Sequence, residues 1–171
     1  MKKNVLIILI SFLVTICSFA STVSLTVVQN ESAPKVSYPL SHKIEGILMD
    51  TFFNMGEIVT NDTLKFDYDN YENKSFGIKQ AINGMADYLL VTRIEYDPIV
   101  LRDSEGKEYP DLKKIEFRLV KLSNKTIITE DKIEKKDFLR KGNNFEETAS
   151  LMAEHVARES YKKLQKNKAI K

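Results

Sequence analysis

The sequence predicts a single α+β domain, a mixed β-sheet with helices packed mainly on one face. Some segments alternate apolar and polar residues as strands do, and others repeat apolar residues at the i, i+3, i+4 spacing of a helix. These segments follow one another in the order β-α-β-α-β-β-β-α. The chain has 171 residues, 43% hydrophobic and 29% charged, without repeats or low-complexity linkers, which suits one globular domain.

The first elements are a strand, a helix and a second strand. Residues 24–28 are β-branched and apolar, as strands often are. After them, Ser41 is expected to cap a helix and Gly56 to end it in the left-handed conformation. The apolar face of this helix is formed by Ile44, Ile47, Leu48, Phe52 and Met55. Residues 57–60 form the short strand that follows.

The middle of the chain predicts a short helix and a central strand. The helix begins near Ser75 and ends at Gly84. Residues 86–96 start apolar on both faces, as a strand buried on both sides does. Residues 97–112 are expected to form a long loop, because two prolines and a glycine lie there among charged residues.

A hairpin and a long helix complete the predicted domain. Residues 113–122 alternate cleanly, which predicts a strand with one solvated face. Ser123-Asn124-Lys125 is a tight turn, and residues 126–133 pair back in antiparallel fashion. Asn144 and Glu147 have the spacing of a capping box and begin the final helix, whose last turns are rich in lysine.

Residues 1–20 have the layout of a secretory signal peptide. Two lysines precede an apolar run, residues 5–16, and small residues stand at positions −3 and −1 of a cut between Ala20 and Ser21. We therefore expect export to the periplasm or cell envelope, with residues 21–171 as the mature domain. The apolar run is shorter than the ~20 residues that span a bilayer, and its retention as an anchor is the alternative.

Cysteine and charge restrict the classes of partner. Cys17, the one cysteine, lies in the predicted signal, which leaves no disulfide or cysteine-ligated metal for the mature chain. Lipidation of Cys17 is disfavoured, because bulky Ile16 precedes it. Membrane contact is expected only if the signal is retained or Cys17 is lipidated. The mature chain has 24 basic and 24 acidic residues, so nucleic acid is not an expected partner.

No catalytic, cofactor or metal site is predicted. His42 and His155 stand apart, and no serine lies in a Gly-x-Ser-x-Gly elbow. The acidic stretch of residues 67–73 lacks the spacing and glycine of a calcium loop. Glu116 and Glu130 are candidate paired carboxylates for glycoside cleavage, but cross-strand ion pairs with neighbouring cations explain them better.

Four tyrosines are the predicted partner-binding residues. Tyr68, Tyr71, Tyr96 and Tyr109 fall in or beside predicted loops. Exposed tyrosines often anchor protein interfaces, because each combines a large apolar ring with a hydroxyl group.

Three short motifs carry a resemblance over most of residues 22–166. They are a helix running into a strand (Ile47–Thr60), a Gly-Met-Ala-Asp-Tyr strand entry (Gly84–Val91) and the Ser-Asn-Lys hairpin turn. The chain thereby resembles the small periplasmic domain of bacterial envelope lipoproteins that activate penicillin-binding proteins or build the curli secretion channel, and the related N-terminal domain of TolB. The resemblance implies protein scaffolding in the envelope rather than catalysis.

Three functional hypotheses follow. The first is a non-catalytic protein-binding or scaffold module of the envelope, with contacts from residues 67–73 and 97–112. The second is a carrier of small ligands, with a pocket between sheet and helices. The third, less favoured, is an envelope hydrolase that uses Glu116 and Glu130.

Overall fold

The computed structural model describes residues 20–66, 68–140 and 144–169. The predicted signal peptide with Cys17 lies outside these residues, apart from Ala20. The elements are β1 (Thr22–Gln29), η1 (Lys35–Ser37), α2 (Tyr38–Asn54), β2 (Ile58–Asn61), η2 (Tyr68–Glu72), α3 (Ile78–Asn83), β3 (Tyr88–Arg102), β4 (Glu108–Lys121), β5 (Thr126–Glu134), η3 (Lys135–Asp137) and α4 (Phe145–Ala169), where η marks a 3-10 turn. The strands and α-helices follow the predicted order, and the α+β class is confirmed.

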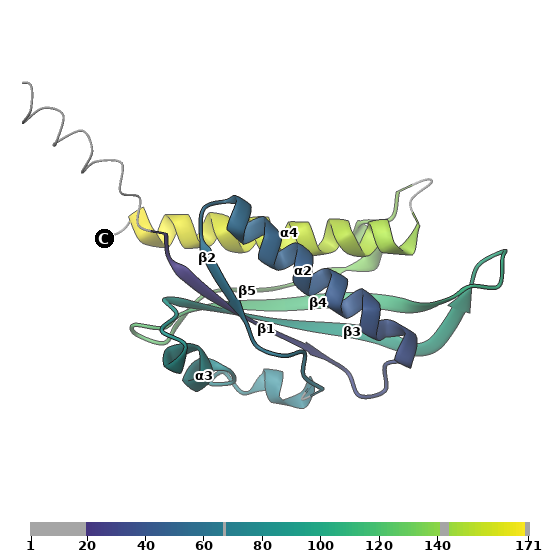
Figure 1. The fold of residues 1–171 in the computed structure, drawn as a ribbon, viewed down its shortest axis with the longest axis horizontal. Coiled ribbons are helices and arrows are strands. Elements are labelled where there is room, and N and C mark those ends of the chain that lie inside the picture. Colours follow the sequence, from purple (N-terminus) through teal and green to yellow (C-terminus); the bar gives the residue numbers. More distant parts are fainter. Residues whose placement is uncertain (1–19, 67, 141–143, 170–171) are drawn as a thin grey trace, which may run out of the picture.

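One mixed sheet organises the molecule (Figure 1). Its strand order is β2-β1-β3-β4-β5, with β1 parallel to both β2 and β3 and the remaining pairs antiparallel. Helices α2 and α4 cover one face, whereas α3 and η2 lie on the other (Figure 1). Residues 88–94 of β3 are all buried, which confirms the predicted central strand.

Two hydrophobic clusters fill the space on either side of the sheet. The larger lies beneath α2 and α4, where Ile44, Leu48 and Phe52 are fully buried along the predicted apolar face of α2. The smaller lies beneath α3 and η2 and contains Leu89 and Val91 of β3. Burying a side chain of this size contributes about 1.5–3 kcal/mol, so both clusters stabilise the fold.

Of the three helix ends predicted from capping residues, two are confirmed and one is wrong. Gly56 adopts φ +89° after α2, and Asn144 and Glu147 exchange backbone-to-side-chain hydrogen bonds of 2.8 and 3.1 Å at the start of α4. The predicted cap at Ser41 is wrong. Helix α2 begins one turn earlier, with Pro39 in its first turn, so Ser41 is buried inside it and its hydroxyl donates to Gln29 at 2.7 Å.

The predicted loop over residues 97–112 is also wrong, because β3 and β4 continue pairing through Arg102 and Glu108. We call residues 97–111 the β3–β4 arm; its connecting turn is residues 103–107. Asp97 pairs with Asp111 and Val100 with Pro110, so Pro98 and Ile99 form a bulge. The prolines suggested a loop, but a strand tolerates proline at a bulge or where a neighbouring strand is missing.

The arm begins where β1 ends. Asn30, the residue after β1, accepts a hydrogen bond from the Tyr96 backbone N–H (2.9 Å) and donates to the Tyr96 carbonyl (3.0 Å). One side chain thus satisfies the backbone groups that the next residue pair of a β-ladder would satisfy. Beyond this point β3 has no neighbour on its β1 side among the described strands.

Replacing Asn30 should destabilise the fold at this junction. We expect Asn30→Ala to lower the free energy of unfolding by about 2 kcal/mol, because the buried backbone groups of Tyr96 lose their partners. Urea denaturation measures this loss. Asn124→Ala is the matched control, since Asn124 also accepts a backbone hydrogen bond but lies exposed in a turn. Equal losses in the two variants would contradict the role given to Asn30.

Candidate functional site

The polar face of β4 is the first candidate site. Alternate residues of a strand point to the same side, so Lys114, Glu116 and Arg118 share one face. This face was predicted to be solvated, which is wrong for two of the three. Arg118 is fully buried and the Glu116 side chain is only 13% exposed, because segment 71–74 lies across them.

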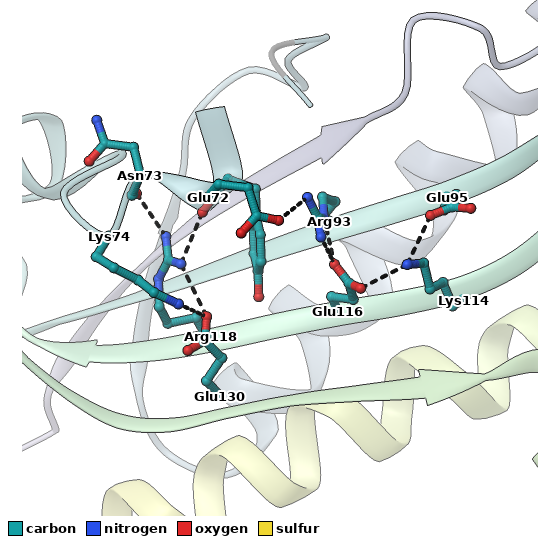
Figure 2. Close-up of polar contacts among 10 residues, drawn as sticks. Glu72, Asn73, Lys74, Arg93, Glu95, Lys114, Glu116, Arg118 and Glu130 are labelled. Carbon is teal, nitrogen blue, oxygen red and sulfur yellow. Dashed lines mark hydrogen bonds and ion pairs between the residues drawn. The ribbon is translucent and has the colours of Figure 1, made fainter. Parts of the chain in front are cut away.

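One run of alternating charges crosses this face (Figure 2). Lys114 Nζ lies 3.0 Å from Glu95 and 2.9 Å from Glu116. Glu116 also pairs with Arg93, which contacts Glu72 at 2.8 Å. The run therefore joins β3 and β4 to the last residue of η2, and each charge has an opposite charge beside it.

A second group of charges holds the chain just after η2 (Figure 2). Arg118 donates to the carbonyl oxygens of Tyr71 (3.0 Å) and Asn73 (3.2 Å). It also lies 3.3 Å from Glu130 of β5, which forms an ion pair with Lys74. A buried guanidinium needs such acceptors, because removing its charge from water is costly. Arg118 thus positions segment 71–74 on the sheet.

Tyr71 lies between two guanidinium groups. The Cζ atoms of Arg93 and Arg118 lie 4.4 and 4.7 Å from the centre of its ring, as in cation–π contacts. Burial raises the pKa of Tyr71 well above its ordinary value. The prediction that Tyr71 is an exposed interface anchor is wrong, because the ring is buried and packs within the fold.

The other predicted tyrosines have different surroundings. Tyr96 is fully buried with its hydroxyl 2.9 Å from Ser41, so it is not exposed either, and burial raises its pKa. Tyr109 is partly exposed and stacks on Phe145 with ring centres 4.5 Å apart. The side chain of Tyr68 lies outside the described part of the structure. A role of Tyr109 in binding stays a prediction.

The candidate carboxylate pair is held by cations. Burial raises the pKa of Glu116, but hydrogen bonds and charges from Lys114 and Arg93 outweigh it and the net pKa is lowered. The pKa of Glu130 is lowered in the same way, by Lys74 and Arg118 against burial. Glycoside cleavage needs one carboxyl group that keeps its proton, and these two are arranged to lose theirs.

The histidines lie on different helices. His42 of α2 is exposed beside Glu45, and His155 of α4 is exposed against the Phe138 ring. Residues 20–66, 68–140 and 144–169 contain no group of three or more potential metal ligands, and none of their helices is long and apolar enough to cross a bilayer. Glu72, from the acidic stretch, pairs with Arg93. Asp67 lies outside the described residues.

The β3–β4 arm is the second candidate site. It forms the end of the molecule opposite the last turns of α4 (Figure 1). Its two strands lack outer neighbours among the described strands, because β1 pairs only as far as Ile94 and β5 begins to pair at Lys114. The bulge leaves Ile99 60% exposed. Open strand edges and exposed apolar side chains are features that bind other chains. The sequence predicted that this region makes contacts with a partner, but it predicted a loop where the structure has two paired strands.

Several surface clefts open on the described part of the chain, including the following three. One of about 540 Å³ lies beside Ser21 and Lys168, one of about 760 Å³ beside Asn30 and Tyr96, and one of about 380 Å³ beside Phe145. All three open to solvent and have both polar and apolar walls. Carrier pockets instead enclose most of the ligand surface in largely apolar walls.

Known proteins are similar to this chain in sequence, for one family, and in fold, for several solved structures. Residues 22–165 match a family model described as "Uncharacterised protein". No curated protein matches the chain. The PelC dodecamer from Paraburkholderia phytofirmans is similar in structure, with TM-score 0.52, 14% identity, and coverage of 80% of this chain and 84% of that one. Lipoprotein GNA1162 from Neisseria meningitidis has TM-score 0.47 and 12% identity, covering 81% and 96%. At these identities the likeness to PelC shows the fold alone, and the weaker one carries no argument.

The ion pairs around Glu116 predict a pH-dependent stability. We expect Glu116→Gln to lower the free energy of unfolding by about 3 kcal/mol at neutral pH, because Arg93 and Lys114 lose a buried partner. The folded-state pKa of Glu116 lies below its ordinary value, so its contribution is present above about pH 4.5 and disappears as pH falls through the folded pKa. Urea denaturation near pH 7 and near pH 3 measures both values.

The control for this prediction is Glu105→Gln, which removes an exposed carboxylate in the turn of the β3–β4 arm. It should change the stability little at either pH. A loss for Glu116→Gln that is the same at both pH values would show that shape, and not charge, explains the effect.

Proposed function

The chain belongs to the family described as "Uncharacterised protein", and we propose that it is an exported, non-catalytic protein-binding module of the bacterial cell envelope. The observation that carries the proposal is the β3–β4 arm, a two-stranded ribbon with open edges and an exposed isoleucine at its bulge. Such a ribbon can pair with another chain through its backbone and bury Ile99 in the contact.

Export is the second part of the proposal. Its support is the signal-peptide layout of residues 1–20, together with the resemblance to periplasmic envelope domains. The structural likeness to PelC adds that this fold occurs in a bacterial protein that assembles as a dodecamer. We propose the same general use here, in which the fold serves contacts between chains rather than a reaction.

The electrostatics of the polar face favour this function over hydrolysis. Its charged groups are paired with one another, and its two candidate carboxylates have lowered pKa values. A small-ligand carrier is the second candidate function. The cleft beside Asn30 and Tyr96 is open to solvent, unlike an enclosed carrier pocket, but its volume of about 760 Å³ is large enough for a ligand.

Cross-linking in cells of the native host tests the proposed function. A tagged full-length chain is cross-linked, purified under denaturing conditions and analysed by mass spectrometry. We expect a reproducible envelope protein to be recovered, and Ile99→Lys to reduce its recovery at least fivefold, because a charge replaces an apolar contact at the bulge. Ile99 is exposed, so the thermal unfolding temperature should stay unchanged.

The matched control is Leu139→Lys, since Leu139 is also 60% exposed but lies outside the β3–β4 arm. It should leave recovery of the partner unchanged. Equal recovery with Ile99→Lys would contradict binding through the arm. Recovery of the chain alone would contradict the protein-binding function and favour a search for ligands in the cleft.

A further inference from the structure

A group of charges meets the first residues of β1. The amino ends of β1, β2 and β3 lie at one end of the molecule, beside the last turns of α4 (Figure 1). Ser21 precedes β1, Glu57 precedes β2 and Asp87 precedes β3. The predicted cut lies between Ala20 and Ser21, so the amino group that it creates would belong to this group of charges.

Glu57 is the centre of the group. Its side chain is only 2% exposed, and its carboxylate accepts a hydrogen bond from the Ser21 backbone nitrogen at 2.6 Å. Lys168 Nζ lies 2.7 and 3.0 Å from its two oxygens, and Gln165 donates to it at 3.1 Å. Four close contacts therefore link the start of β1, the start of β2 and the end of α4 through one buried carboxylate.

A second carboxylate contacts the next residue. Asp87 accepts a hydrogen bond from the Thr22 backbone nitrogen at 2.9 Å. Burial raises the pKa of Tyr88, and the charges of Asp87 and Glu57 raise it further, as expected in a negative local field. Lys121 lines the adjoining cleft, but its ammonium forms no ion pair with either carboxylate within the described structure. Glu57 thus pairs with Lys168, whereas Asp87 forms no ion pair within the described residues but binds the Thr22 backbone nitrogen.

We propose that Glu57 is the receptor for the α-amino group that forms when the chain is cut between Ala20 and Ser21. The proposal rests on the export part of the proposed function. In the uncut chain the Ser21 nitrogen is a neutral amide. Hydrolysis adds the oxygen of one water to the Ala20 carbonyl carbon, breaks the C–N bond and leaves a primary amine on Ser21. This amine binds a proton and becomes an ammonium group.

The cut therefore places a positive charge against Glu57, 2.6 Å from its carboxylate in the uncut geometry. A charge-assisted hydrogen bond is about twice as strong as a neutral one, so β1 is held more firmly to Glu57 after processing. An α-amino group ordinarily has a pKa of about 7.7–8.0, and the contact raises it in the folded state. The added stability is present below about pH 7.7 and is lost as pH rises through that raised value.

Export of the full chain supplies the material for the test. The mature protein is purified from the native host, and its first residue is determined by mass spectrometry. A second protein carries one glycine inserted between Ala20 and Ser21, so that a cut after Ala20 leaves Ser21 as an amide and moves the amine one residue away. Glu57→Gln is combined with both forms, and Glu31→Gln, an exposed carboxylate away from the group, is the matched control.

We expect the inserted glycine to lower the equilibrium constant of folding at least tenfold in the native background. The inserted glycine should still lower the equilibrium constant of folding tenfold in the Glu31→Gln background, but less than twofold in the Glu57→Gln background. In the native background the effect of the insertion should also decrease as pH rises through the raised pKa of the α-amino group. An equal effect of the insertion with and without Glu57→Gln would overturn the proposal, even where export and partner capture are intact.

Two further readouts keep the test decisive. A mature chain that begins at a residue other than Ser21 would overturn the assigned cut, whatever the cross-linking experiment on the β3–β4 arm shows. If the Glu57→Gln variant does not fold, the pKa of the α-amino group is measured by NMR in the native and the glycine-inserted proteins instead. A value at least one unit above that of the glycine-inserted form supports the receptor, and equal values overturn it.

Discussion

The structure depends on covering the central strand β3 on both faces. Residues 88–94 are all buried, so a hydrophobic layer is required above and below them. Helices α2 and α4 supply a large layer on one side. Among the described residues, the other side is covered by the six-residue helix α3 and the turn η2, which are too small to cover the sheet by apolar contacts alone.

Charged side chains complete that second cover. Arg118 reaches from β4 to the backbone carbonyls of Tyr71 and Asn73, while the Tyr71 ring fills the space between Arg118 and Arg93. Buried ion pairs add little net stability, because desolvation offsets their attraction. Their geometry is specific, however, and here they determine where the segment after η2 lies. The polar face that resembled a catalytic site is thus part of the fold.

The two ends of the molecule differ because strands stop at different points. At one end β1 ends at Gln29 and β5 pairs only from Lys114, so β3 and β4 continue alone as the β3–β4 arm. At the other end three strands begin together and α4 reaches across to Glu57. A free ribbon suits contact with another chain, whereas the crowded end suits a fixed junction. The proposed binding and processing roles therefore occupy opposite ends.

The sequence by itself determined the order of elements, the end of α2 at Gly56 and the capping box of Asn144 and Glu147. These depend on side chains a few residues apart, whose spacing is visible in the chain. Only the tertiary structure decided that Tyr71, Tyr96 and Arg118 are buried and that residues 97–111 form a paired arm. Burial and strand pairing depend on what a distant segment places opposite a residue, and local pattern does not contain that information.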